Sequence, residues 1–348
     1  MNELNLKETE LVKLITHRVG NKLREEDLVL TTSETLFDID SGEYIMQYFL
    51  QDFKVPEFFS FSHSEELEMN KVYSLAKQIF ESRDNFKDAS HEMAKLLYDC
   101  SIHPKVKEGE MNVAYFDNLI LGEEVVDGIG IFKTERYVPF LKMKGSNIQY
   151  TIEHDHGIEL KKIDKACMIF NIDSDYGYVV LIIDNQSKSD DALYWKEDFL
   201  NLAPLNDEYY NTKEYLTMTK DFVSNEIPED LGLESTDRIQ LLNRSIDYFK
   251  ENDAFDKNHF EDEVFQDESL IDSFRKYDEL MRSRRDLELD DNFNISNHAV
   301  KKQQRVFKSV LKLDKNFHVY IHGDKKLIER GTENDGRKFY KIYYENEA

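Results

Sequence analysis

The sequence predicts an α+β protein, in which an N-terminal antiparallel sheet with helices precedes an acidic helical region and a small C-terminal β-rich segment. Three observations support this class. Closely spaced strand-like runs alternate with turn residues between about 111 and 184. Apolar stripes at helical spacing lie on either side of them, and the charge reverses sign near the C-terminus. A length of 348 residues suggests two or three domains.

Two amphipathic helices are expected ahead of the strands. A short strand over 28–32 and a short helix over 44–50 come first. Ser62 and Glu65 then have the spacing of a capping box, which predicts a helix start. The apolar stripe that follows is Met69, Val72, Tyr73, Ala76, Ile79 and Phe80. The second helix carries Ala89, Met93, Leu96 and Leu97 and is expected to end at His103-Pro104.

The strand-rich part has short turns, which favour an antiparallel sheet. We expect the two helices to cover one face of this sheet, forming an α+β domain over residues 1–190. A polar stretch at 185–191 (NQSKSDD) marks the expected boundary. The predicted strands are 111–121, 125–134, 147–153, 166–170 and 178–184.

The next expected region, 191–296, is helical and acidic. Residues 221–296 hold 22 acidic and nine basic residues, a net charge of -13. The simpler interpretation is a solvated helical surface, because charge runs usually face water. The alternative is an acidic face that docks a basic partner or mimics nucleic acid.

The third region, 297–348, is basic and is expected to pack with the helical region. It holds 12 Lys and Arg against seven Asp and Glu, whereas the whole chain has a net charge of -25. Paired strands are expected over 307–313 and 317–322, and a last strand over 337–344. The candidate DNA-binding residues are Lys301, Lys302, Arg305, Lys308 and Lys312.

Two interpretations of this basic run remain open. If residues 298–308 form a helix, then 301, 305 and 308 share a face that can follow a phosphate backbone. Alternatively, the run balances the acidic helices of the same molecule. A second cluster, Arg282, Arg284 and Arg285, has acidic neighbours, so intramolecular pairing is expected there.

No catalytic motif stands out. The chain has no dinucleotide-binding, P-loop or nucleophile-elbow pattern, and Gly128 and Gly130 lie within a predicted strand. His154-Asp155-His156 is the most metal-like cluster, but it lacks a third ligand, and a polar hairpin tip is the expected structure. Cys100 and Cys167 form neither a disulfide framework nor a zinc ribbon. We therefore expect no enzyme, no metal and no cofactor.

The overall charge limits the possible partners. A net charge of -25 repels nucleic acid and anionic membranes, so any nucleic-acid contact must be local. The charged N-terminus lacks the apolar core of a signal peptide, and no run approaches the ~18 apolar residues of a membrane span. A cytoplasmic protein without a membrane partner is expected.

Three stretches of the chain resemble the bacterial nucleoid-associated protein family of the NdpA and YejK type, in the version found in Bacteroides-type bacteria. The first runs from Gly128 to Glu135 and leads to Phe140-Leu141-Lys142. The second covers 163–171 and 177–181 and continues through 194–202, and the third covers 307–318 and the strands after it. The resemblance implies a place on the bacterial chromosome, through DNA binding or through DNA-handling proteins such as topoisomerases. It implies no catalytic residue.

Three hypotheses follow from the residues and the resemblance. The first is a cytoplasmic nucleoid protein that binds double-stranded DNA through its basic C-terminal segment. The second is a protein-interaction module that reaches the nucleoid through a partner and uses the acidic residues of 194–296. The third, and the least supported, is a hydrolase of nucleic acid.

Overall fold

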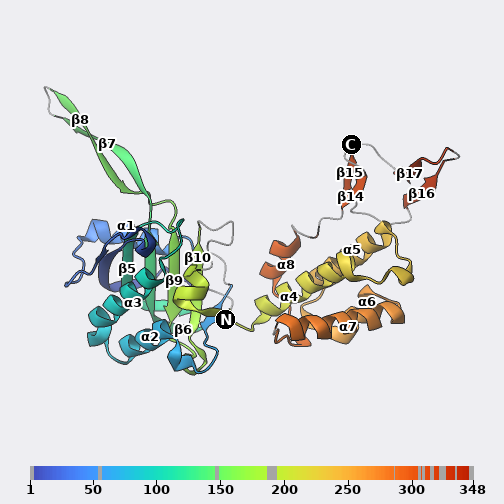
Figure 1. Cartoon of the computed structure of the whole chain (residues 1–348), viewed down its shortest axis with the longest axis horizontal. Helices are drawn as coiled ribbons and strands as arrows, with labels where there is room; N and C mark the ends of the chain where they lie inside the picture. The colour runs from blue at the N-terminus through green and yellow to red at the C-terminus, as the bar shows by residue number, and fades with distance from the viewer. Residues whose placement is uncertain are drawn as a thin grey trace. The chain divides into compact units, whose positions relative to one another are not determined.

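The computed structural model divides the chain into two compact units, Met1–Leu205 and Asn206–Ala348 (Figure 1). Each unit has its own hydrophobic core. The structure describes residues 4–53, 57–145, 149–185, 194–285, 287–304, 307, 310–313, 317–320, 327–333 and 335–344.

A nine-stranded antiparallel sheet forms the centre of the first unit, in the order β11-β4-β10-β9-β6-β5-β2-β3, with β1 paired to β5. The predicted α+β class is confirmed, as are the four predicted strands that correspond to β5, β6, β9 and β10. The sequence pattern did not predict β2, whose alternation is interrupted by the buried His17. The strands are β1 (Leu4–Asn5), β2 (Glu10–Val19), β3 (Leu28–Val29), β4 (Phe59–Phe61), β5 (Gly109–Leu121), β6 (Glu124–Thr134), β9 (Lys165–Phe170), β10 (Val179–Asp184) and β11 (Leu202–Pro204).

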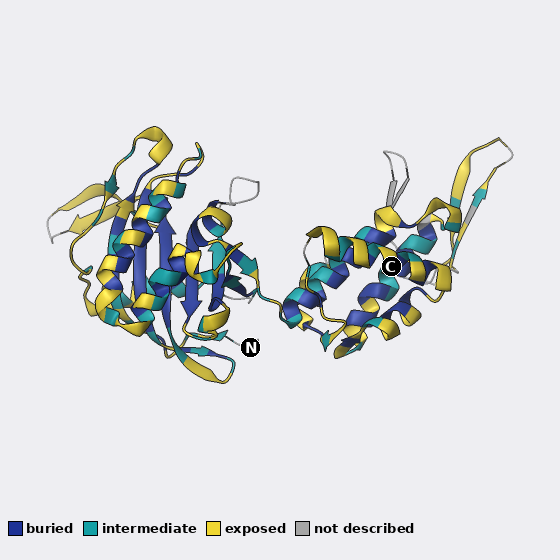
Figure 2. Ribbon diagram, turned by 60° about the horizontal axis from the view of Figure 1, so that its bottom comes forward, coloured by how far each residue is buried: buried dark blue, intermediate teal, exposed yellow. Residues whose placement is uncertain are grey.

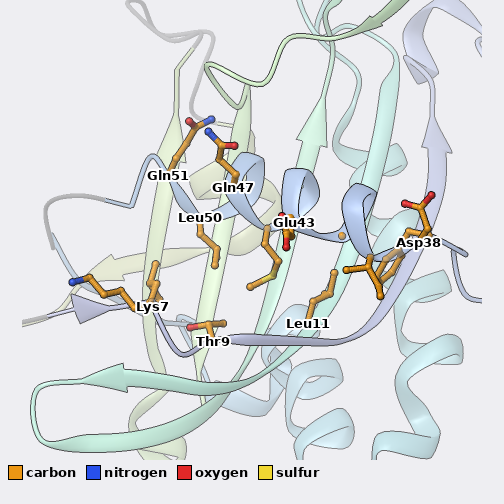
Figure 3. Close-up of a pocket in the computed structure, with 13 residues that line it drawn as sticks. Lys7, Thr9, Leu11, Asp38, Glu43, Gln47, Leu50 and Gln51 are labelled. Carbon is orange, nitrogen blue, oxygen red and sulfur yellow. The ribbon is translucent and has the colours of Figure 1, made fainter.

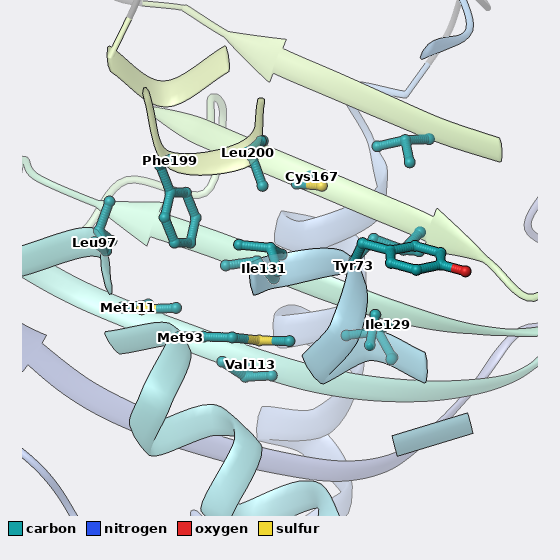
Figure 4. Packing of buried hydrophobic residues seen from close by; sticks show 14 of the residues in the cluster. Tyr73, Met93, Leu97, Met111, Val113, Ile129, Ile131, Cys167, Phe199 and Leu200 are labelled. Carbon is teal, nitrogen blue, oxygen red and sulfur yellow. The ribbon is translucent and has the colours of Figure 1, made fainter. Parts of the chain in front are cut away.

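One face of the sheet is covered by α2 (Lys71–Glu81), α3 (Phe86–Cys100) and a π-helix, Tyr194–Leu200. Their side chains interdigitate with those of the strands (Figure 4). The predicted stripe of α2 is confirmed, because Val72, Tyr73, Ala76 and Ile79 are buried. The predicted capping box is wrong. Asn70 caps α2 by accepting a hydrogen bond from the Tyr73 amide, and Met69 lies outside the helix, exposed.

The opposite face is covered more thinly. Among the described residues one helix, α1 (Ile39–Leu50), packs on it, and Phe49 of α1 stacks on Phe132 of β6 with 3.9 Å between ring centroids. Several apolar side chains of this layer, including Leu6, Leu11 and Met46, stay only partly buried. One short helix cannot shield so wide a sheet from water.

A two-stranded arm leaves the body of the first unit between β6 and β9 (Figure 1). It consists of β7 (Tyr137–Gly145) and β8 (Tyr150–Ile158). The expected hairpin tip at His154-Asp155-His156 is wrong, because these residues lie inside β8 and His154 pairs with Leu141 of β7. The strand predicted over 147–153 is therefore displaced toward the C-terminus.

The first unit continues beyond the boundary expected near residue 190. Residues 186–193 lie outside the described residues, but the segment after them returns to the first core. Trp195 is fully buried there, and β11 pairs with β4. The sheet therefore includes strands from both sides of the polar stretch, and the division follows Leu205.

The second unit is mainly helical, as predicted, with a short β12–β13 hairpin. Its core is rich in aromatic side chains, and Figure 2 shows the buried sides of its helices facing inward. The elements are α4 (Glu208–Asp221), α5 (Ser235–Glu251), β12 (Ala254–Asp256), α6 (Lys257–Val264), α7 (Glu268–Arg285), β13 (Asn292–Asn294) and α8 (Asn297–Gln304).

Two hairpins follow α8. The first pairs β14 (Val310–Leu313) with β15 (Phe317–Tyr320), as predicted, and the second pairs β16 (Ile328–Thr332) with β17 (Lys338–Ile342). Ile239 of α5 contacts side chains of both hairpins. The C-terminal segment thus packs on the helical region.

Candidate nucleic-acid interface

The basic C-terminal segment begins on α8, which is held firmly in the second unit. The Ser296 amide donates a hydrogen bond to Thr212 Oγ1 of α4 over 3.0 Å. Ala299 and Val300 are buried against the core. With these residues inside, the next turn of α8 carries Lys301 and Lys302 outward, and both are exposed.

The two lysines have different surroundings. Lys302 Nζ donates to the Tyr209 hydroxyl over 3.1 Å, which ties it to α4. Lys301 makes no ion pair within the described part of the chain. Both lie in the last turn of α8, where a positive charge also interacts favourably with the helix dipole. Lys301 is therefore the more available of the two for an external anion.

The remaining candidates are not placed as a group. Arg305 and Lys308 lie outside the described residues, and α8 runs from Asn297 to Gln304. Lys312 lies in β14, opposite His318, but its side chain is also outside the description. The structure brings Lys301 and Lys302 together, whereas the helical face shared by 301, 305 and 308 stays a prediction.

The other basic cluster of this unit is used internally. Arg282 Nε lies 2.8 Å from Asp278 Oδ1, and its Nη2 lies 2.7 Å from Asp291 Oδ1. Arg285 pairs more loosely with Asp221, at 3.7 Å. The expected intramolecular pairing is therefore confirmed for Arg282 and Arg285. Asp278 is fully buried, so its carboxylate needs a cation beside it.

The helices of the second unit also present many carboxylates to solvent. These side chains lie on α5, α6, α7 and the loops between them, so the negative charge is spread over several elements rather than over one helix face. The exposed members are Asp247, Glu251, Asp253, Asp256, Asp262, Glu263, Asp267, Glu268, Asp272 and Glu279.

A buried ionic cluster in the first unit was not anticipated from the sequence. Lys133 lies near the end of β6, and Lys165 is the first residue of β9. The Lys133 side chain is completely buried, and this burial lowers its pKa. Lys133 Nζ lies 3.0 Å from Glu135 Oε1, and Lys165 Nζ lies 2.7 Å from Asp184 Oδ2. The Tyr194 ring packs beside both ammonium groups. This cluster fastens the π-helix to the sheet.

His154 and His156 lie on the same face of the arm, with 6.4 Å between their ring centroids. Within the described ranges, no group of three or more His, Cys, Asp and Glu side chains is arranged to hold a metal ion. No helix in that part of the chain has the length and apolar character to cross a membrane.

Comparison with known families decides where the chain belongs. The family model described as nucleoid-associated protein YejK matches residues 15–340, which is nearly the whole chain. The chain belongs to this family. The match spans both units of the nucleoid-associated protein, including the arm, α8 and most of the C-terminal hairpins. No individual curated protein matches it. The resemblance seen in the sequence is therefore confirmed, and the family supports a nucleoid-associated role.

Proposed function

We propose that this nucleoid-associated protein binds double-stranded DNA directly, in the cytoplasmic nucleoid, through its basic C-terminal segment. Four residues contact phosphates, namely Lys301, Lys302, Arg305 and Lys308, and Lys312 lies at the edge of the contact. The acidic helices face away from the duplex. The role is one of binding, with no catalytic step and no cofactor.

The observation that supports this proposal most is the exposure of Lys301 beside Lys302 at the end of a helix anchored by the core. An ammonium group that no carboxylate neutralises can replace a condensed counterion on a phosphate. Residues 298–312 contain no acidic residue at all, so the segment presents one sign of charge to a duplex. The net charge of -25 of the whole chain opposes any broader contact.

The acidic surface of the second unit supports a second candidate function. Its exposed carboxylates suit a partner with a basic surface, such as a DNA-handling protein of the topoisomerase type. In that case the protein reaches the nucleoid through the partner, and the purified chain alone does not bind DNA.

Titration of the purified full-length chain with duplex DNA at several salt concentrations separates the two functions. Direct binding through four phosphate contacts gives a slope of log affinity against log salt of about -3.6. A random-sequence duplex binds as well as any defined site, because phosphates carry no sequence information. Absence of binding at low salt by a folded protein contradicts direct binding and favours recruitment by a partner.

A further inference from the structure

Arg244 of α5 differs from two other half-buried arginines of the second unit. Arg238 donates to the Val223 carbonyl over 2.8 Å, and Arg282 pairs with Asp278. The Nε atom of Arg244 is buried without a hydrogen-bond partner, and Arg244 forms no ion pair within the described part of the chain. Burial lowers the pKa of its guanidinium, although an arginine stays charged at neutral pH. A cation in such a place is unfavourable, so an external acceptor would stabilise it.

Arg244 lines a hollow between α5 and the junction of α6 with α7, called the Arg244 pocket below. Its volume is about 460 Å³, which lies in the range of pockets that take small ligands. Asp237, Leu241 and Arg244 recur at helical spacing and form the α5 side of the pocket. The other side comes from the α6–α7 junction, where the chain turns at Gln266 with a φ of 64°.

The Arg244 pocket also has an apolar part and an acidic part. Three carboxylates line it, those of Asp230, Asp237 and Asp267. Asp267 accepts a hydrogen bond from the Leu270 amide over 3.1 Å, and Asp237 accepts one from the Glu234 amide over 2.9 Å. Among the described residues, the pocket thus combines an unpaired cation with an apolar wall and a negative surface. The side chains of the apolar wall are Leu231, Leu233, Leu241, Phe265 and Leu270.

A larger hollow in the first unit, between α1 and the start of β2, lacks this combination within its described lining (Figure 3). Its volume is about 790 Å³, and its lining is mainly apolar. The charged side chains there, Lys7, Asp38 and Glu43, are exposed to solvent. The Arg244 pocket is smaller, but its buried donor can select one kind of ligand.

The three parts of the Arg244 pocket specify the chemistry of that ligand. A carboxylate accepts two parallel hydrogen bonds from one edge of a guanidinium, and the Nε atom that lacks a partner belongs to such an edge. The apolar wall suits an aliphatic or aromatic side chain beside the carboxylate. The three aspartates favour positive charge elsewhere in the ligand. They oppose a nucleic acid, which brings further negative charges with each phosphate.

The spacing of the charges favours a peptide over a single amino acid. Asp237 and Arg244 are seven residues apart on α5, which is ~10 Å along the helix axis. The carboxylate and ammonium groups of one amino acid share a carbon atom and are too close together to reach both sites. Three residues of extended chain span ~10 Å. A basic residue two or three positions before a terminal apolar residue therefore matches the pocket.

We propose that the Arg244 pocket binds the C-terminal end of a partner polypeptide. The terminal carboxylate lies on the Arg244 guanidinium, the last side chain packs on the apolar wall, and a lysine or arginine two or three positions earlier faces the aspartates. Binding is non-covalent and involves no reaction. The inference does not depend on DNA binding, because Arg244 lies outside the basic segment 297–348. Titrations with peptide and with DNA therefore test the two separately.

Isothermal titration calorimetry of the full chain with synthetic peptides tests the proposal. The probe is acetyl-Lys-Lys-Ser-Leu with a free terminal carboxylate, and we expect a dissociation constant of about 100 μM or lower. The same peptide with a terminal amide should bind at least about tenfold more weakly, because it lacks the anion that Arg244 recognises. The acidic peptide acetyl-Glu-Glu-Ser-Leu should also bind more weakly, because its side chains are repelled by the aspartates.

Arg244→Met removes the guanidinium and keeps an apolar side chain. It should weaken binding of the carboxylate peptide about 10- to 100-fold, because two charge-assisted hydrogen bonds are lost. Its melting temperature should equal or exceed that of the wild type, because the Arg244 Nε has no partner in the fold to lose. Arg244→Lys keeps the charge without the paired geometry, so its affinity should lie between the two.

The matched control is Arg284→Met, which removes the same charge from an exposed position of α7. Arg284 is 14 residues beyond Leu270 on the same helix, or ~21 Å from the pocket, so affinity should stay within about twofold. If Arg244→Met does not fold, Asp230→Lys at an exposed position replaces it as the test. This variant should narrow the preference for the basic peptide over the acidic one.

Several results would overturn the proposal. They are no binding of the carboxylate peptide to the folded chain at ~1 mM, equal binding of the amide, and unchanged affinity in folded Arg244→Met. An unchanged preference between the basic and acidic peptides in Asp230→Lys would count against it equally. Free leucine binding as tightly as the peptide would assign the pocket to a single amino acid instead.

Discussion

Lys133 and Glu135 form an ion pair with 3.0 Å between Nζ and Oε1, and both side chains are almost completely shielded from solvent. The Lys133 ammonium also donates to the Lys107 carbonyl over 2.8 Å. The pair lies where β6 leaves the sheet for the arm, beneath Tyr194 of the π-helix. A charge pair in such a place is costly to break, because the surviving partner stays buried.

Replacing Lys133 with Met is predicted to destabilise the first unit by about 3–5 kcal/mol, because Glu135 is then left charged and unpaired. Urea denaturation followed by far-UV circular dichroism measures the loss. The double variant Lys133→Met with Glu135→Leu should recover much of the stability, since it removes both charges. Equal losses in the single and double variants would show that packing, not the unpaired charge, sets the cost.

His17 is predicted to make stability pH-dependent. Burial, with a smaller contribution from nearby His91, lowers its pKa from 6.5 to about 4. The His17 ring makes a hydrogen bond with the Ser90 hydroxyl and accepts a second one from the Thr31 amide. Between pH 6.5 and 4 the unfolded chain binds a proton at this site that the folded chain does not. The free energy of unfolding therefore falls as pH falls, by up to ~1.4 kcal/mol per pH unit.

Urea denaturation of the wild type and of His17→Gln at pH 7, 6 and 5 isolates this effect. Carboxylates titrate in both proteins, so the difference between the two curves reports His17. We expect the stability advantage of the wild type over the variant to shrink as the pH decreases from 7 to 5. A difference that stays constant over this range would show that His17 protonates without cost in the fold.

Reversing two charges of the basic segment is predicted to weaken DNA binding without unfolding the protein. In the variant with Lys301→Glu and Arg305→Glu, affinity should fall alike for all duplex sequences, and the salt slope should become shallower by about 1.8. Thermal denaturation should be unchanged, because Lys301 is exposed. DNA titration and melting are measured on the same preparation.

The matched control is Lys161→Glu with Lys162→Glu, an equal change of charge on exposed residues of the first unit. It should alter DNA affinity much less than the change at 301 and 305. If the basic segment instead balances acidic helices of its own chain, the variant at 301 and 305 loses stability and shows no selective effect on DNA. Unchanged affinity in a folded variant would remove the segment as the DNA site.

The first unit is predicted to fold as residues 1–205 but not as residues 1–190. The shorter fragment loses Trp195, which is fully buried and donates from Nε1 to the Ala166 carbonyl over 3.4 Å, and it loses β11. Within the full chain, Trp195→Ala should cost about 3–5 kcal/mol through the cavity it leaves. Cooperative unfolding of the 1–190 fragment, measured by circular dichroism, would contradict this division of the chain.

Local sequence patterns determined much of the secondary structure of this protein and the position of its candidate DNA-binding segment. The helical spacing of Val72, Tyr73, Ala76 and Ile79 predicts their burial, because one face of a helix repeats every 3.6 residues. The pairing of β14 with β15 follows from two apolar runs around a short turn. The reversal of charge after residue 297 is a property of composition alone and identified the candidate DNA-binding segment.

The sequence by itself thus determined the α+β class, the family and the basic segment, because each of these depends only on neighbouring residues or on composition. Only the tertiary structure decided that Lys133 is buried, that β11 completes the first sheet, and that Leu141 of the arm lies in solvent. The sequence pattern does not predict the arm strand that begins at Tyr137. Whether its apolar face is covered depends on which distant elements pack against it, and pattern along a strand does not record those partners.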